Sequence, residues 1–167
     1  MVRLHETLDT RLPIGAAFAF VADFGNAAEW DPGVAWSKAV GEGAVRIGST
    51  SELGVRMAGR VAPMEYSVVL LEPNRRVVLE GSGSNISATD DIRFEPTPDG
   101  TRIDYAADIR LHGWLRLIQP FTGRAFASVA RNARDGMQRT LDALASRAAA
   151  QRLTEGVEPG ASEGRAA

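Results

Sequence analysis

The chain opens with a segment in which apolar and polar residues alternate. In residues 2–10, Val2, Leu4 and Leu8 share one parity, and most of the polar residues occupy the other. A period of two residues is typical of a β-strand that buries one face and exposes the other. The chain is therefore expected to begin with a half-buried strand.

Two short helices are predicted after this strand. Pro13 suits the first turn of a helix, and Phe18 and Val21 give that helix an apolar stripe before Gly25 ends it. The string NAAEWD follows, and Asn26 is a suitable N-cap for a second helix.

Six further strands are predicted after Pro32. The segments are separated by GEG near residue 42, GR near 59, EPN near 73, GSGSN near 83 and TPDG near 98. Breaks of this length favour hairpins, and consecutive hairpins produce an antiparallel meander. Alternation predicts one buried face in the later strands. Its members are residues 62, 64, 66, 68 and 70, residues 86, 88, 90, 92 and 94, and residues 103, 105, 107, 109 and 111.

From about residue 115 the apolar period becomes that of a helix. Pro120 predicts the start of the regular part, which continues to Ala148, while LRLIQ before it forms a separate turn or short helix. A helix of this length needs a sheet on which to bury its stripe. We expect one domain over residues 1–149 and a disordered tail over 150–167, which is small, polar and rich in Gly and Pro.

Composition narrows the classes of function. The chain has 167 residues, a formal net charge of -2 and no cysteine. The charge balance lacks the basic excess that binds nucleic acid, and thiolate chemistry and cysteine-ligated metals are excluded. His5 and His112 lie far apart and on different parities, so we expect no metal site. The sequence has no P-loop and no GxGxxG motif, so we expect no cofactor either. No run is long enough to span a membrane, and a cytoplasmic location is expected.

Three strings carry a resemblance to a known family. They are FAFVADFGNAAEWDPGV after Pro13, MEYSVVLLEPNRRVVLEG at 64–81 and PDGTRIDYAADIRLHGWLRLIQPF at 98–121. With the order of elements, they resemble the START-related superfamily, also called SRPBCC or Bet v 1-like, of polyketide cyclases, aromatases and lipid-transfer domains. The resemblance covers about residues 2–148. It implies an α+β helix-grip fold, in which a curved seven-stranded antiparallel sheet wraps around the C-terminal helix and encloses a cavity.

Two acids interrupt the apolar parity of their strands. Glu6 lies on the inner parity of the first strand, and Asp90 lies on that of the sixth. A carboxyl group that faces an apolar interior has a raised pKa, as a general acid or base near neutral pH requires. Both are candidate catalytic residues. The structural alternative is that each binds a buried arginine, a backbone amide or water, or that a bulge turns it outward.

The candidate ligand-binding residues share an inner parity or a place beside a strand end. Tyr66 and Tyr105 offer an apolar ring with a polar tip, and tryptophans at strand ends guard a cavity mouth or plug the end of a sheet. Methionines on the inner face serve equally as core filler. The remaining members of the set are Ser51, Met57, Met64, Trp30 and Trp114.

Three functions follow from this reading. The leading hypothesis is a protein of the polyketide cyclase/dehydrase type that binds an apolar small molecule. If it is an enzyme, the predicted reaction is cyclisation, dehydration or isomerisation of a carbonyl substrate. The alternative is a non-catalytic carrier or sensor of a lipid or isoprenoid. A third is an interaction protein that uses HGWLRLIQPF as an apolar contact surface. The sequence does not predict an oligomeric state.

Overall fold

The computed structural model describes residues 1–57, 59–113 and 123–155. The strands are β1 (Val2–Thr10), β2 (Val34–Val40), β3 (Thr50–Met57), β4 (Arg60–Glu72), β5 (Arg76–Ser82), β6 (Ile86–Thr97) and β7 (Gly100–Leu111). The helices are α1 (Ile14–Ala22), a 3-10 turn (Phe24–Asn26), α2 (Ala27–Trp30) and α3 (Gly123–Glu155).

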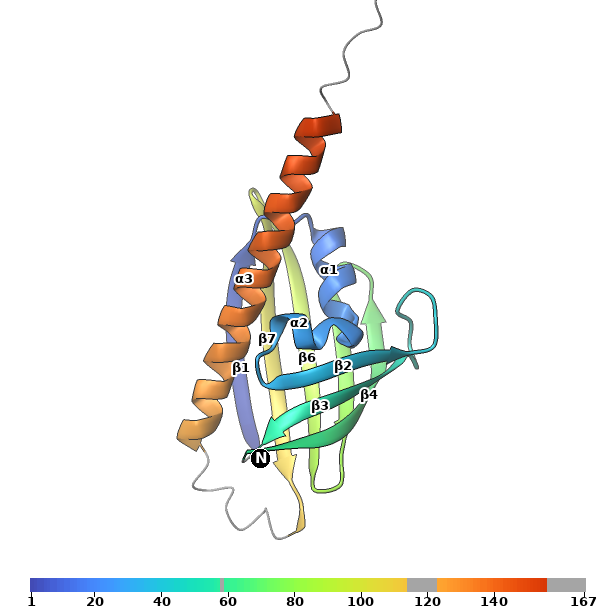
Figure 1. The fold of residues 1–167 in the computed structure, drawn as a ribbon, viewed down its shortest axis with the longest axis vertical. Coiled ribbons are helices and arrows are strands. Elements are labelled where there is room, and N and C mark those ends of the chain that lie inside the picture. The colour runs from blue at the N-terminus through green and yellow to red at the C-terminus, as the bar shows by residue number, and fades with distance from the viewer. Residues whose placement is uncertain (58, 114–122, 156–167) are drawn as a thin grey trace, which may run out of the picture.

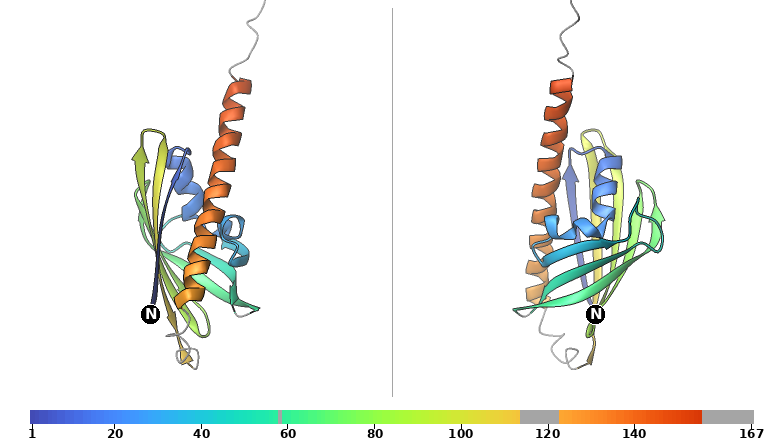
Figure 2. Two further views of the ribbon diagram at one scale, coloured as in Figure 1. Left: turned by 90° about the vertical axis from the view of Figure 1, so that its left-hand side faces the viewer. Right: turned by 45° about the vertical axis from the view of Figure 1, so that its right-hand side comes forward.

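The strands form one seven-stranded antiparallel sheet in the order β1-β7-β6-β5-β4-β3-β2. Strands β2 to β7 are a continuous meander, and β1 pairs with β7 at the far edge. The sheet curves around α3, and α1 and α2 lie on the same concave side (Figures 1 and 2). The predicted helix-grip architecture is confirmed.

The predicted buried face is correct for β6 and β7 and only partly correct for β4. Ile86, Ala88, Asp90, Ile92 and Phe94 are all buried on β6. In β4 the register shifts between Val68 and Leu70. A bulge reverses the alternation that follows it, so Leu71 packs against the core in place of Leu70.

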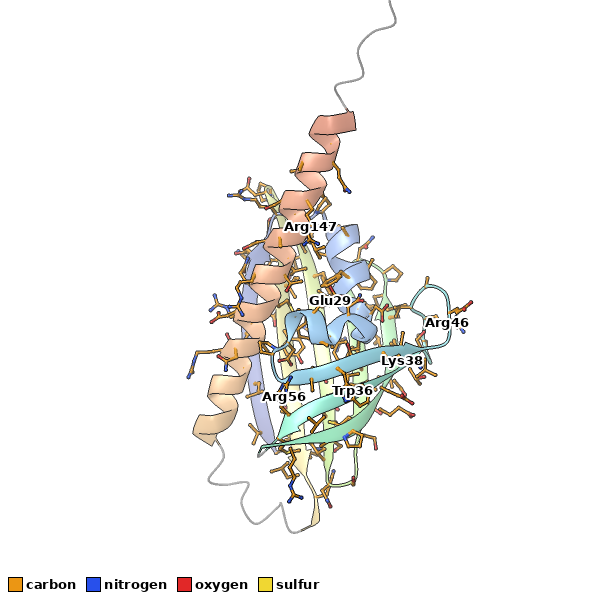
Figure 3. All side chains as sticks on the ribbon, in the orientation of Figure 1. Glu29, Trp36, Lys38, Arg46, Arg56 and Arg147 are labelled. Atoms are coloured by element: carbon orange, nitrogen blue, oxygen red, sulfur yellow. The ribbon has the colours of Figure 1, made fainter. Side chains whose placement is uncertain are left out.

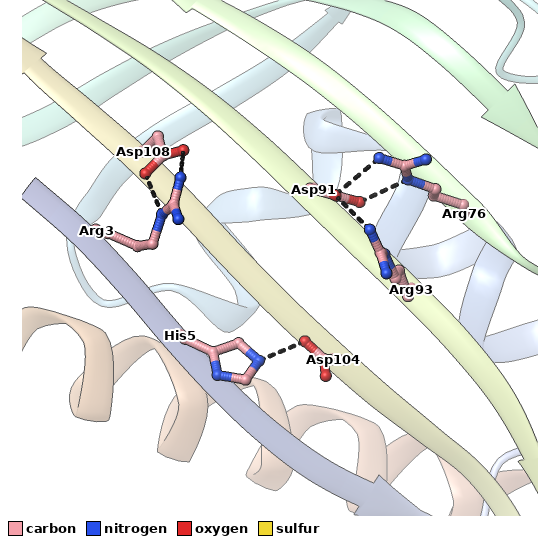
Figure 4. A network of polar contacts seen from close by, with 7 residues as sticks. All are labelled: Arg3, His5, Arg76, Asp91, Arg93, Asp104 and Asp108. Carbon is pink, nitrogen blue, oxygen red and sulfur yellow. Dashed lines mark hydrogen bonds and ion pairs between the residues drawn. The ribbon is translucent and has the colours of Figure 1, made fainter. Parts of the chain in front are cut away.

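The outer face of the sheet carries charged pairs that join neighbouring strands (Figure 4). Arg3 on β1 pairs with Asp108 on β7 at 2.8 Å, and His5 pairs with Asp104 at 2.6 Å. Asp91 on β6 accepts from Arg76 at 2.8 Å. Since these pairs are exposed or partly exposed, they favour the register more than they add stability.

Helix α1 fills one end of the space under the sheet. Its buried residues include Phe18 and Val21, and the Phe18 ring meets the Phe94 ring edge-on at 5.1 Å between centroids. Ile92 and Ile103 are fully buried in the same cluster. This end of the molecule is therefore a packed core.

The middle of helix α3 is hydrogen-bonded to β1 and α2. Gln138 donates to the backbone carbonyl of Asp9 at 2.8 Å, and Thr140 donates to that of Glu29 at 2.9 Å. A β-carbon at Gly136 would collide with the Trp30 carbonyl oxygen, so this glycine allows α2 to approach the helix closely. The contact fixes the distance between α3 and α2.

The C-terminal end of α3 differs from the prediction. The helix continues past Ala148 to Glu155, and its last turns project beyond the sheet (Figure 1). Residues 150–155 are thus helical rather than part of the predicted tail. The predicted start at Pro120, the LRLIQ turn and residues 156–167 lie outside the described residues. Among the helices of the described ranges, none is long and apolar enough to cross a membrane.

Candidate functional site

A cavity of about 390 Å³ lies between the sheet and α3, at the end that α1 leaves uncovered. Its wall is mostly apolar, and its polar members come from β3, β4, β6, β7 and the turn after α2. The residues that line it are Leu4, Phe24, Ala27, Trp30, Asp31, Gly33, Val34, Leu53, Val55, Arg56, Met57, Met64, Tyr66, Ile86, Ala88, Asp90, Tyr105, Ala107, Ile109, Leu111, Ala130 and Ala133.

Small side chains create this space. Ala88 on β6 lies beside Gly81 on β5, and Ala107 on β7 lies opposite Asp90. From the other side, α3 presents Ala130 and Ala133 to the cavity. Alanines at facing positions leave a gap between the sheet and the helix that larger side chains would fill.

Asp90 lies in the cavity wall with 3% of its surface exposed. The Tyr105 hydroxyl donates to its Oδ1 at 2.5 Å. Because Asp90 is opposite Ala107, Tyr105 is its diagonal neighbour on the same face of the adjacent strand and reaches it across the pair. The second oxygen, Oδ2, is buried and has no hydrogen-bond partner among the described residues.

Burial raises the pKa of Asp90 from 3.8 to about 7. The hydrogen bond from Tyr105 opposes this rise, while the negative charge of Asp31 adds to it. Tyr66 also lowers the pKa of Asp90. It acts at longer range than Tyr105, because its hydroxyl group does not form a hydrogen bond with Oδ2. Burial is likewise the main reason that the pKa values of Tyr66 and Tyr105 lie well above 10. Asp90 is therefore poised to gain or lose a proton near neutral pH, while both tyrosines stay protonated.

Asp91 shows that position on the sheet sets this behaviour. It follows Asp90 on β6 but points to the outer face, where the hydrogen bond from Arg76 is the main reason that its pKa is lowered. Two adjacent aspartates are thus shifted in opposite directions, one by burial without a cation and the other by an ion pair.

Tyr66 is held over Gly81. The two residues are opposite each other on β4 and β5, and a β-carbon at Gly81 would lie only 2.5 Å from Cζ of the Tyr66 ring. The ring also packs against Phe24, with 5.2 Å between centroids. Glycine therefore lets the ring lie flat on the sheet and point its hydroxyl towards the Asp90 region.

Asp31 and Arg56 are cavity residues that the sequence reasoning missed. Asp31 follows α2, and its Oδ1 accepts from the Gly33 backbone amide at 2.7 Å. Burial is the main cause of its raised pKa. Arg56 is exposed on β3 beside the start of β2 (Figure 3), and its backbone amide donates to the Gly33 carbonyl at 2.7 Å. The DPG string that follows Trp30 was the available signal, because it is typical of an Asx turn.

Trp30, Met57 and Met64 line the cavity together with the two tyrosines. Trp30 is 2% exposed, and its ring meets that of Tyr105 at 6.2 Å. Its Nε1 is a second buried polar atom without a partner among the described residues.

The other predicted site residues lie elsewhere. Ser51 is buried beside a separate groove of about 90 Å³ that Asp23 also lines. Glu6 faces inward, but it does not line the cavity, and its Oε2 lies 3.9 Å from Nε of Arg134 on α3. Trp114 lies outside the described residues. Within the described ranges, no group of three or more metal-ligating side chains was found.

Residues 1–149 match the family described as polyketide cyclase / dehydrase and lipid transport, and the chain belongs to this family. None of the curated proteins matches the chain in sequence.

Solved structures share the fold at low sequence identity. The Zhui aromatase/cyclase from Streptomyces sp. R1128 aligns with a TM-score of 0.68 and 14% identity, covering 88% of this chain and 94% of that one. A START superfamily protein from Mycobacterium smegmatis aligns with a TM-score of 0.66 and 14% identity, covering 87% and 98%. A protein from Thermus thermophilus gives 0.65 and 14%, covering 86% and 97%. The START-like fold is thus shared.

Proposed function

We propose that this protein binds a mostly apolar small molecule in the cavity and that Asp90 and Tyr105 transfer a proton to or from a carbonyl-bearing part of it. The reaction class is cyclisation, dehydration or isomerisation. The observation that carries the proposal is a buried carboxyl group with a pKa of about 7, hydrogen-bonded to a tyrosine in the wall of an apolar cavity.

The apolar wall supplies the binding energy. Each Å² of apolar ligand surface removed from water contributes roughly 25 cal/mol, before the cost of immobilising the ligand is subtracted. The same wall keeps water away from the reacting carbonyl and from any reactive intermediate. The few polar groups then orient the ligand rather than hold it.

Tyr105 is the group that would touch the substrate. Asp90 is almost wholly covered, whereas Tyr105 is only half-buried and lines the cavity. Ionised Asp90 accepts the Tyr105 proton as Tyr105 takes one from the carbon next to the substrate carbonyl. The reverse transfer returns the proton to another carbon or to a leaving hydroxyl group. Because the tyrosine pKa is well above 10, this transfer requires the two steps to be concerted.

The test begins with native mass spectrometry of the protein purified from its own host, followed by identification of any co-purified molecule. With that molecule or its precursor, Asp90→Asn should lower turnover by about 10²-fold or more and change affinity only a few-fold. Ala107→Leu, which fills the cavity beside Asp90, should abolish binding instead. Unaltered ligand after incubation, with Asp90→Asn binding like the wild type, would establish a lipid or isoprenoid carrier in place of the enzyme.

The same proposal places the activity in a single domain over residues 1–149 and in the cytoplasm. The family match over residues 1–149 supports the first part. Fractionation of the host, followed by immunodetection of the protein, tests the second.

A further inference from the structure

The cavity has two acidic groups in its described wall and no internal cation. Asp31 and Asp90 both line it, and neither forms an ion pair within the described part of the chain. Arg56 is the one basic residue among the lining residues that the structure describes, and it is exposed. Asp31 and Asp90 share this one cavity, and the negative charge of Asp31 contributes to the raised pKa values of Asp90, Tyr66 and Tyr105.

Asp31 has capacity for a further partner. Its Oδ1 accepts a hydrogen bond from the Gly33 amide, as in an Asx turn. This turn accounts for the role of only one of the two carboxyl oxygens. No partner for Oδ2 is found among the described residues. Asn would make the same turn without burying a charge, so the turn alone does not account for an acid at this position.

The surrounding rings favour positive charge as well. Phe24, Trp30, Tyr66 and Tyr105 line the same cavity, and their centroids are linked in a chain of contacts from 5.2 to 6.2 Å. Aromatic faces attract cations, most strongly where water is excluded. A second, independent observation is that Asp90 Oδ2 in this wall is buried and lacks a partner among the residues described.

We propose that the ligand carries a positively charged nitrogen that Asp31 binds, with its apolar body extending along the aromatic wall towards Asp90. This inference rests on the proposed ligand-binding function and specifies its ligand class as an organic ammonium compound. Asp31 is then the anchor for the ligand, and Asp90 keeps its separate role in proton transfer. Such a ligand complements a cavity whose described wall has two acids, four aromatic rings and one arginine, which is exposed.

Three probes with one apolar body and different polar groups test this inference: 1-naphthylmethylamine, 1-naphthylmethanol and 1-naphthoate. Their affinities for the full chain are measured by calorimetry at about pH 8, where most of Asp90 is ionised. We expect the amine to bind about tenfold or more tightly than the alcohol, and the carboxylate to bind most weakly. Asp31→Asn should remove the preference for the amine while leaving alcohol binding unchanged.

Two further variants make the result decisive. Arg56→Gln should preserve or increase the preference for the amine, because it removes a competing cation from the wall. Glu29→Gln, an exposed acid on the neighbouring helix α2, is the matched control and should leave all three affinities unchanged. Equal affinities for amine and alcohol overturn the inference but leave the proposed function standing. Failure of all three probes to bind counts against both, and carboxylate binding that is lost in Arg56→Gln would show that the ligand is an anion.

Discussion

Replacing Asp90 by Asn should alter the dependence of stability on pH in a defined way. Asp90 has a pKa of about 7 in the folded protein, against an ordinary value of 3.8. The folded state therefore keeps this proton over a pH range in which the unfolded chain has released it. Stability due to Asp90 is complete below the ordinary pKa, falls as the pH rises towards 7, and then levels off. The pKa difference corresponds to about 4 kcal/mol, at ~1.36 kcal/mol for each pKa unit.

Asparagine has nearly the same shape as aspartate but never ionises. The stability of the variant therefore does not fall as the pH rises towards 7. The free energy of unfolding of Asp90→Asn, minus that of the wild type, should rise by about 3 kcal/mol between about pH 4.5 and about pH 8. Guanidinium chloride denaturation at a series of pH values measures this difference. The constant cost of the altered hydrogen bond to Tyr105 cancels, because only the change with pH is interpreted.

Asp91→Asn is the matched control on the same strand. Its pKa is lowered by the hydrogen bond from Arg76, so its contribution to stability is present above the ordinary pKa and is lost only as the pH falls through the lowered one. The difference between this variant and the wild type should stay nearly flat above about pH 4.5. A flat difference for Asp90→Asn as well would refute the raised pKa and remove the proposed acid or base.

Three further substitutions test the residues that surround the cavity. Gly81→Ala should destabilise the protein by about 1–3 kcal/mol and weaken ligand binding, because the new methyl group displaces the Tyr66 ring; thermal denaturation and titration report both. Gly136→Ala should also destabilise it in thermal denaturation, by about 1–3 kcal/mol, although alanine ordinarily stabilises a helix, because the Trp30 carbonyl occupies the space. Glu6→Gln should change stability by less than about 1 kcal/mol in denaturant and leave turnover intact; a loss of turnover like that of Asp90→Asn would make Glu6 catalytic.

The regular strands were predictable because their inner positions are almost all apolar. In β7, Ile103, Ala107 and Leu111 face inward, charged residues occupy most of the outward positions, and no bulge interrupts the strand. The shift at Val68 in β4 has no such signal, since Val69 and Leu70 are both apolar and either suits the core. The extent of α3 was underestimated for a related reason. Its last turns have no apolar stripe, but they are rich in alanine, which favours helix even where no sheet lies beneath.

Alternation along the strands predicted the site residues that lie on central strands. Asp90, Tyr66 and Tyr105 are inward on central strands, and the structure brings them together. Glu6 has the same parity, but β1 is an edge strand that lies under α3, where Arg134 meets it. Which helix residue faces which strand depends on the crossing angle, and a single sequence does not contain that angle. Asp31 lies on no strand, so its position in the wall depends on how α2 and β3 meet.

The position of the cavity follows from the unequal lengths of the helices that cover the sheet. Helix α1 is only nine residues long and packs Phe18 against Phe94, so the inner side chains at that end are large and closely packed. Towards the opposite end of β6, the inner residues are Asp90 and Ala88, and α3 faces them with alanines. A carboxyl group at the boundary between these halves is buried and forms no ion pair with a described residue. The arrangement that leaves room for a ligand is therefore the same one that keeps the Asp90 proton in place up to neutral pH.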